Sequence, residues 1–133
     1  MKVVWDTNTC IRLLKGNSPA IFKKIENISN SDIIIPAIVR FELYYGAYKS
    51  DKQNETLIKL NDFLRSFDTI DIDSRVAETA GKIRADLDKK GTPVGPYDLL
   101  IAASALSREY KLVTHNTKEF SRIGGLEIED WEE

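Results

Sequence analysis

Carboxylate and amide side chains directly follow two short apolar runs of this sequence. Asp6 comes immediately after Val3-Val4-Trp5, and Asn116 and Glu119 come just after Leu112-Val113-Thr114. Apolar, β-branched runs of this length are typical of buried strands. Because parallel strands gather ligand sites at their carboxyl ends, we expect these three side chains to converge at one edge of a sheet.

Two further acids stand on predicted helices. Glu42 lies in the middle of an apolar helix, where the only other charged residue between positions 36 and 48 is Arg40. Because Arg40 is two residues away, it points to another side of the helix, which favours a distant cation or a metal as the partner of Glu42. Asp98 follows the turn Gly95-Pro96-Tyr97 and begins the next apolar helix.

Each of these positions also has an ordinary structural interpretation. Asp6 and Asp98 are good helix N-caps, and Glu42 suits an exposed helix face. Asn116 suits a local turn, and Glu119 the solvated start of a helix. A shared site is favoured because the predicted topology brings these oxygen-bearing groups to the same edge of one sheet.

An oxygen-only set of ligands points to a hard divalent cation. The sequence has one cysteine, Cys10, and one histidine, His115, which excludes a zinc site built on Cys and His and also an internal disulfide. Carboxylates and an amide suit Mg²⁺ or Mn²⁺. Such an ion lowers the pKa of a bound water, orients it against a phosphodiester and neutralises the charge of the transition state. We therefore predict metal-assisted hydrolysis.

Short β-branched runs alternate with longer helical segments, which is typical of an α/β fold with a parallel sheet. We predict strands over residues 2–5, 33–35, 69–72 and 112–114, and an edge strand over 126–128. The predicted helices cover residues 7–15, 18–28, 36–49, 53–67, 74–89 and 98–110. Because the sequence has no internal repeat and no segment typical of a linker, we expect residues 1–133 to form one domain.

The composition is that of a globular protein, with 42% apolar and 30% charged residues, and the net charge of −2 argues against binding nucleic acid through bulk charge. The charge is uneven, because residues 1–65 hold ten basic and seven acidic residues whereas 66–133 hold nine and fourteen. If the acidic end, 127–133, is solvated, the rest is mildly basic and suits a polyanion. No apolar run reaches the roughly 20 residues of a membrane span, so we expect a cytoplasmic protein with no membrane partner.

Four motifs occur in order along the chain, namely DTN at residues 6–8, Glu42 within PAIVRFEL at 36–43, GPYD at 95–98 and THNTKEF at 114–120. In these motifs the sequence resembles the PIN-domain ribonucleases and, more narrowly, the VapC toxins of type II toxin-antitoxin systems. The resemblance implies a three-layer α/β/α sandwich with a mainly parallel central sheet. It also implies a Mg²⁺- or Mn²⁺-dependent endoribonuclease, inhibition by a cognate VapB-type antitoxin, and a homodimer.

Position by position, the resemblance implies that Asp6, Glu42 and Asp98 are catalytic residues that bind the metal. Thr7 and Thr114 match hydroxyl groups that help to position water, metal or phosphate. Thr7 and Thr114 are thus auxiliary residues of the expected site, and Asn116 completes its catalytic set.

The sequence departs from the family pattern at Asn116, where many PIN nucleases have a fourth acid. An amide supplies one neutral oxygen, so a second metal would be held more weakly at this catalytic position. Glu119 is an auxiliary residue that could substitute for the missing acid. Chemistry with a single metal is therefore an open alternative.

RNA is the implied substrate, and the subgroup with similar GPYD and HNTKEF motifs includes nucleases that cut the anticodon region of initiator tRNA. No base-stacking motif of the RNA-recognition kind is present. RNA choice would then depend on shape and on scattered basic residues, each of which also suits a solvated surface: Arg12, Lys15, Lys49 and Lys52. The apolar residues of 43–48 and 57–67 suit either a dimer interface or the core.

Other functional classes fit less well. A phosphatase of the haloacid dehalogenase type needs a second Asp two residues after the first, and this position is Asn8. A receiver-type domain needs paired acids after the first strand, and no glycine-rich phosphate loop occurs. The alternative that stays is a non-catalytic binding or scaffolding module of the PIN fold, for which a broken set of acids would be expected.

Overall fold

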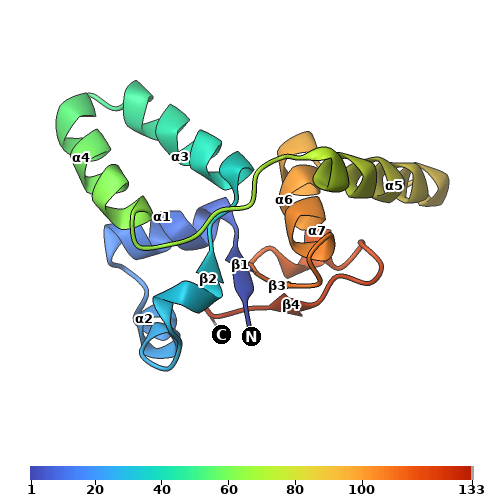
Figure 1. Cartoon of the computed structure of the whole chain (residues 1–133), viewed down its shortest axis with the longest axis horizontal. Helices are drawn as coiled ribbons and strands as arrows, with labels where there is room; N and C mark the ends of the chain where they lie inside the picture. Colours follow the sequence, from blue (N-terminus) through green and yellow to red (C-terminus); the bar gives the residue numbers. More distant parts are fainter. Residues whose placement is uncertain (133) are drawn as a thin grey trace.

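The structure, a computed structural model, describes residues 1–132 and surrounds a four-stranded sheet with helices, which confirms the predicted α/β/α class (Figure 1). The strands are β1 (Val3–Trp5), β2 (Ile33–Ile34), β3 (Lys111–Val113) and β4 (Ile128–Glu129). The helices are α1 (Thr7–Lys15), α2 (Pro19–Ile25), α3 (Ala37–Lys49), α4 (Gln53–Leu64), α5 (Ser74–Lys90), α6 (Pro96–Leu106) and α7 (Thr117–Phe120), with a 3₁₀ turn η1 (Asn30–Asp32).

The sheet has the strand order β2-β1-β3-β4 and is parallel throughout. Val4 lies opposite Ile34 on one side and Leu112 on the other, so β1 and β3 occupy the centre. From β1 the chain crosses to β2 on one side of the sheet, and from β3 it crosses to β4 on the other side. The carboxyl ends of β1 and β3 therefore form the topological switch point, where parallel sheets open a crevice for ligands.

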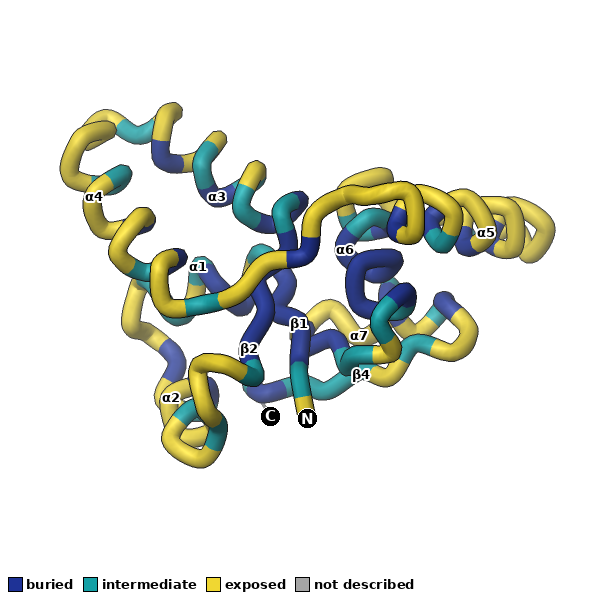
Figure 2. The backbone as a smooth tube through the Cα atoms, viewed as in Figure 1, coloured by how far each residue is buried: buried dark blue, intermediate teal, exposed yellow. Residues whose placement is uncertain are grey.

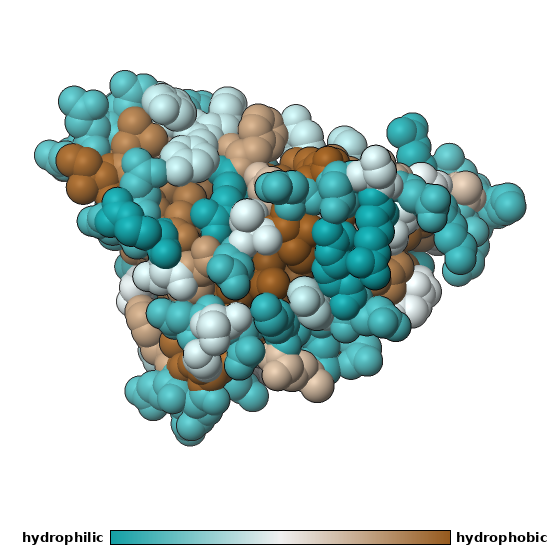
Figure 3. All heavy atoms as spheres, viewed as in Figure 1, coloured by the Kyte–Doolittle hydropathy of each residue, from teal (hydrophilic) through white to brown (hydrophobic). Residues whose placement is uncertain are grey.

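The core lies around β1, whose three residues are all buried. Trp5 packs against Phe67 and against Trp131, with ring centroids 5.3 and 5.9 Å away. Figure 2 shows buried backbone along β1 and β2 and exposed backbone on the outer turns of α4 and α5. Figure 3 shows hydrophilic side chains over the outer end of α5 and hydrophobic ones nearer the middle of the same face. In the described part of the chain, no helix combines the length and apolar character of a membrane span.

In the described residues of the acidic end, Asp130 and Glu132 are held against the rest of the protein, whereas Glu127 is exposed. Glu132 forms an ion pair with Arg12 at 3.2 Å, and Asp130 contacts His115 Nδ1 at 2.9 Å. The hydrogen bond and the negative charge of Asp130 raise the pKa of His115. Because Asp130 and Glu132 are held against the rest of the protein, the condition of a solvated acidic end is not met for these two residues.

The predicted strand over residues 69–72 is absent. An isolated bridge joins Asp68 to Ile34 beside β2, and the amides of Ile35 and Ala37 donate to the carbonyls of Asp68 and Ile70 at 2.9 Å each. The Ile35 carbonyl accepts a hydrogen bond from Arg40 Nε at 2.9 Å instead of from a backbone amide of this segment. The segment therefore follows β2 through these backbone bonds, but the reciprocal bond of a regular parallel ladder is missing and no strand forms.

Other differences concern the ends of elements. α6 begins at Pro96 rather than at residue 98, because proline is favoured as the first residue of a helix. α4 ends at Leu64 rather than at 67, since Phe67 turns inward to pack on Trp5. The edge strand covers Ile128–Glu129 rather than 126–128.

The docking of the C-terminal segment predicts a large loss of stability in Trp131→Ala. Trp131 is only 5% exposed, and removing a buried aromatic ring of this size costs about 3–5 kcal/mol of unfolding free energy. Urea unfolding measures the change, with Ile58→Ala as the control, because Ile58 is exposed and its loss is expected to stay within about 0.5 kcal/mol. Equal stability of the two variants would show that the segment does not hold the core together.

Candidate metal centre

Asp6 is fixed at the switch point by both of its carboxylate oxygens. It is 4% exposed and caps α1, with Oδ1 accepting a hydrogen bond from the Thr9 amide at 2.9 Å. Its Oδ2 accepts from Thr114 Oγ1 at 2.6 Å, across from β1 to the end of β3. The capping interpretation is thus confirmed for one oxygen, while the other faces the crevice side of the sheet.

Glu42 joins this region from the middle of α3. Thr7 Oγ1, in the first turn of α1, donates to Glu42 Oε1 at 2.7 Å. Arg40 is engaged elsewhere, because its guanidinium donates to the carbonyls of Ile35 and Phe67 at 2.9 Å each. As predicted, Arg40 is not the partner of Glu42, which leaves this half-buried carboxylate without a neighbouring cation from its own helix.

Asp98 is the third residue of α6 and not its N-cap, since Gly95 holds that position. The capping interpretation of Asp98 is therefore wrong. Burial, together with the negative charges of Glu119, Glu42 and Asp6, raises the pKa of Asp98 to about 6. The four carboxylates consequently lie close enough to one another to oppose full ionisation.

Asn116 and Glu119 act as a pair. Asn116 Nδ2 donates to Glu119 Oε2 at 3.0 Å, and the Gly95 amide donates to Oε1 at 3.2 Å. The Asn116 amide in turn donates to Thr114 Oγ1 at 3.0 Å. The structure thus brings Glu119, rather than the Asn116 side chain, next to Asp98 as the fourth carboxylate.

An open cleft of about 620 Å³ contains Asp6, Thr7, Glu42 and Asp98 in its walls. Five further lining residues had been given no site role: Asn8, Ile11, Phe41, Tyr45 and Tyr97. Two of them had a signal in the sequence, because Phe41 directly precedes Glu42 and Tyr97 directly precedes Asp98. A residue next to a ligand on a helix often lines the same cavity.

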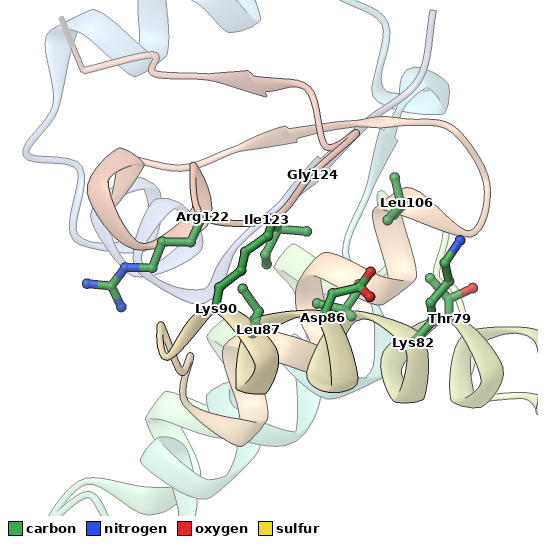
Figure 4. A pocket seen from close by; sticks show the side chains of 10 residues that line it. Thr79, Lys82, Asp86, Leu87, Lys90, Leu106, Arg122, Ile123 and Gly124 are labelled. Atoms are coloured by element: carbon green, nitrogen blue, oxygen red, sulfur yellow. The ribbon is translucent and has the colours of Figure 1, made fainter.

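A second hollow lies beside α5 and shares no lining residue with the cleft (Figure 4). It measures about 140 Å³ and is bordered by side chains of both charges, among them Lys82, Asp86 and Arg122. It contains none of the predicted site residues. The larger cleft, by contrast, is lined by four of them, Asp6, Thr7, Glu42 and Asp98.

The residues of the cleft fit a hard divalent cation. All its charged groups are carboxylates, and no Lys or Arg is among the described residues that line it. Cys10 offers no alternative ligand, because it is fully buried and burial raises the pKa of its thiol. A cation bound by these oxygens would supply positive charge and so offset the repulsion between carboxylates that contributes to the raised pKa of Asp98.

One tighter cluster has another role. His115, Asp130 and Glu132 hold ligand atoms within 4.8 Å of one another, a spacing that no three of the carboxylates Asp6, Glu42, Asp98 and Glu119 match. Arg12 already pairs with Glu132, and His115 with Asp130, so these contacts fasten the C-terminal segment. The wider spacing in the cleft suits Mg²⁺, which keeps several waters and takes only one or two carboxylates directly.

The fold and this site define the class of protein. The family model of the PIN domain matches residues 3–126, and the chain belongs to the PIN-domain family. Within that family it belongs to the VapC ribonucleases, as its relatives show.

Two curated relatives are both called tRNA(fMet)-specific endonuclease VapC. The protein from Shigella flexneri is 41% identical and that from Salmonella typhimurium 44% identical, each over 98% of both chains. Among solved structures, DNA-bound VapBC from Salmonella typhimurium contains a chain with a TM-score of 0.93 and 43% identity, covering 98% of both chains. VapBC2 from Rickettsia felis, bound to a promoter DNA fragment, has one with a TM-score of 0.89 and 35% identity, covering 98% and 99%.

The crowding of acids predicts that Asp98→Asn stabilises the metal-free protein at neutral pH. The pKa of Asp98 is about 6 in the folded state against an ordinary 3.8, so stability falls as the pH rises through this window. Without metal, Asp98→Asn should therefore raise the melting temperature by a few degrees at pH 7.5 and leave it unchanged near pH 3.8. Calorimetry in EDTA measures both, with the exposed Glu78→Gln as a charge-matched control. A gain of equal size at both pH values would contradict the assignment.

Proposed function

We propose that this chain is a Mg²⁺- or Mn²⁺-dependent endoribonuclease that hydrolyses RNA phosphodiester bonds in the cleft between α1, α3 and α6. The observation that carries the proposal is the meeting of four carboxylates from separate elements, three of which, Asp6, Glu42 and Asp98, line a cleft that contains no described cation. When bound, the metal lowers the pKa of a water and neutralises charge on the phosphate. The intact acid set argues against the alternative of a non-catalytic binding module.

In this proposal each side chain has a separate task. Asp6 is the rigid ligand, because its position is set by two hydrogen bonds from different elements. Glu42 and Asp98 are ligands on helices, and the Thr7 hydroxyl orients Glu42. Glu119 supplies the fourth carboxylate and accepts a proton from water more readily than an amide would.

Two residues act through others. Thr114 is a positioning residue, since its hydroxyl donates to Asp6 while accepting from the Asn116 amide. Asn116 is assigned the task of holding Glu119 through its Nδ2. The resemblance had implied a catalytic role for Asn116, and the hydrogen bonds favour this indirect one.

Initiator tRNA is the proposed substrate. It is the substrate in the names of the two curated relatives at 41% and 44% identity over nearly the whole chain. The GPYD and HNTKEF motifs of the same subgroup are present here at residues 95–98 and 115–120. An enzyme with this substrate would act in the cytoplasm, where tRNA is found.

A VapB-type antitoxin is the proposed protein partner, because the similar structures from Salmonella typhimurium and Rickettsia felis are VapBC complexes. A groove of about 540 Å³ between α1, α3 and α4 is a suitable docking place. It is mainly apolar, and it shares Ile11 and Glu42 with the cleft. A segment bound there would reach the metal ligands and block RNA.

A homodimer remains a prediction. Most apolar residues of the two expected interface segments are in the core, among them Leu43, Leu60 and Leu64. Tyr48 and Ile58 are exposed and are the large side chains from those segments that a second copy could cover outside the cleft.

Removing one ligand charge should abolish RNA cleavage without unfolding the protein. Asp6→Asn, Glu42→Gln and Asp98→Asn are each expected to lower kcat/KM by more than about 100-fold, beyond the loss typical of residues that only orient ligands. Cleavage of purified bacterial tRNA with Mg²⁺ or Mn²⁺ measures this, with EDTA and Glu78→Gln as controls. Retention of full activity in Asp6→Asn or Asp98→Asn would exclude the proposed centre.

Filling the apolar groove should weaken inhibition by the antitoxin while leaving tRNA cleavage unchanged. A side chain at Gly46 meets no atom within 4 Å of its Cβ, so Gly46→Trp is expected to fold, to cleave tRNA normally and to lose at least about 10-fold in inhibition by a VapB-type antitoxin. Gly81→Trp is the matched control, because Gly81 also has open space but lies on α5 away from the groove. Unchanged inhibition of Gly46→Trp would place the antitoxin elsewhere.

A further inference from the structure

Two exposed aromatic rings stand beside the carboxylates of the cleft. Phe41 and Tyr97 each precede a proposed ligand, Glu42 and Asp98, and keep 50% and 48% of their surface exposed. Their ring centroids lie 5.5 Å apart at an interplanar angle of 71°, in an edge-to-face pair between α3 and α6. Both line the cleft rather than the core, so half of their surface is available to a ligand.

The aromatic wall continues one turn along α3. Tyr45 lines the same cleft and is 60% exposed. Lys49 lies one further turn along, with Nζ 5.5 Å from the centroid of the Tyr45 ring. Phe41, Tyr45 and Lys49 therefore follow one another at intervals of four residues, about 6 Å of helix axis each. The row leads from the carboxylates to a positive charge.

We propose that Phe41, Tyr45 and Tyr97 form a stacking platform for unpaired RNA bases next to the scissile phosphate. This inference rests on the proposed function and adds a structural requirement to it, that the substrate must present unpaired nucleotides at the cleavage site. Bases of single-stranded loops stack on aromatic side chains, whereas bases within a helix are covered by their neighbours. Lys49 lies where the phosphate backbone would leave the platform.

The surroundings favour a base over other occupants. The rings offer an apolar face that suits a neutral base, whereas in the proposed function the phosphate is bound beside them through the metal. The cleft of about 620 Å³ is in the range that small-molecule sites occupy and has room for a nucleotide. The rings also share the cleft with the proposed ligands, so a second copy seated on them would block the reacting atoms. Tyr48 and Ile58, which are outside the cleft, suit such a contact better.

The test uses a synthetic RNA hairpin with the anticodon loop of a bacterial initiator tRNA, and copies with a single abasic nucleotide at each loop position. Tyr97→Leu and Phe41→Leu should lower kcat/KM on the intact hairpin about 10-fold, because stacking is worth about that much per base. Tyr97→Phe and Phe41→Tyr keep an aromatic ring and should lose far less of kcat/KM than the leucine variants. An abasic nucleotide at the stacked position should lower the kcat/KM of the wild-type protein by a similar factor. It should not lower the kcat/KM of the leucine variants further, since they have already lost the same stacking contact.

A binding readout accompanies the rates. In Asp98→Asn, hairpins with 2-aminopurine in the loop should lose fluorescence on binding, and this quenching should disappear when Phe41 or Tyr97 is also leucine. Tyr48→Leu is the matched control for an exposed aromatic residue outside the cleft, and melting temperatures check that all variants fold.

The outcomes separate the two hypotheses. If the wild-type protein cleaves no RNA with any metal, the proposed function fails. If it cleaves the hairpin but the leucine variants cleave equally well, or a fully paired duplex of the same sequence is cut at the same rate, the platform is wrong and the proposed function stands. Leucine variants that change only the oligomeric state in sedimentation would assign the rings to a contact between copies and overturn the platform.

Discussion

The hydrogen bond from Thr114 to Asp6 joins the two central strands at the point where the site is built. It exists because β1 and β3 are paired in parallel, so that the residue after each strand meets the other at one sheet edge. The bond fixes one oxygen of Asp6, and the capping of α1 fixes the other. A carboxylate so firmly held is a reference point, around which the more weakly held Glu42, Asp98 and Glu119 are arranged.

The site accumulates negative charge that the folded chain does not neutralise. Two arginines that are close to these acids in the sequence have other partners. Arg40 donates to backbone carbonyls, and Arg12 forms an ion pair with Glu132. The resulting repulsion, together with burial, appears in the raised pKa of Asp98. Such a cluster weakens the metal-free fold and is the condition for binding a divalent cation strongly, so stability and activity oppose each other at these positions.

Two sets of side chains share the cleft, and they alternate along the chain. Glu42 and Asp98 provide charge, while the residues just before them, Phe41 and Tyr97, provide aromatic surface. Because neighbouring residues on a helix project about 100° apart, one helix can supply both a carboxylate and an aromatic ring to different sides of the same cavity. In the proposed function, the chemistry and the choice of RNA would therefore be coupled through the same helices, α3 and α6.

The sequence by itself determined the α/β class, the parallel sheet and the identity of the acids, because these depend on local periodicity and on motifs that are continuous in the chain. Tertiary structure alone decided that Glu119 stands beside Asp98 while Asn116 supports it, since that depends on hydrogen bonds between distant segments. It also decided that residues 69–72 are not a strand, because Arg40 occupies the needed carbonyl. The docking of Trp131 on Trp5 likewise could not be predicted, because it depends on packing between the two ends of the chain.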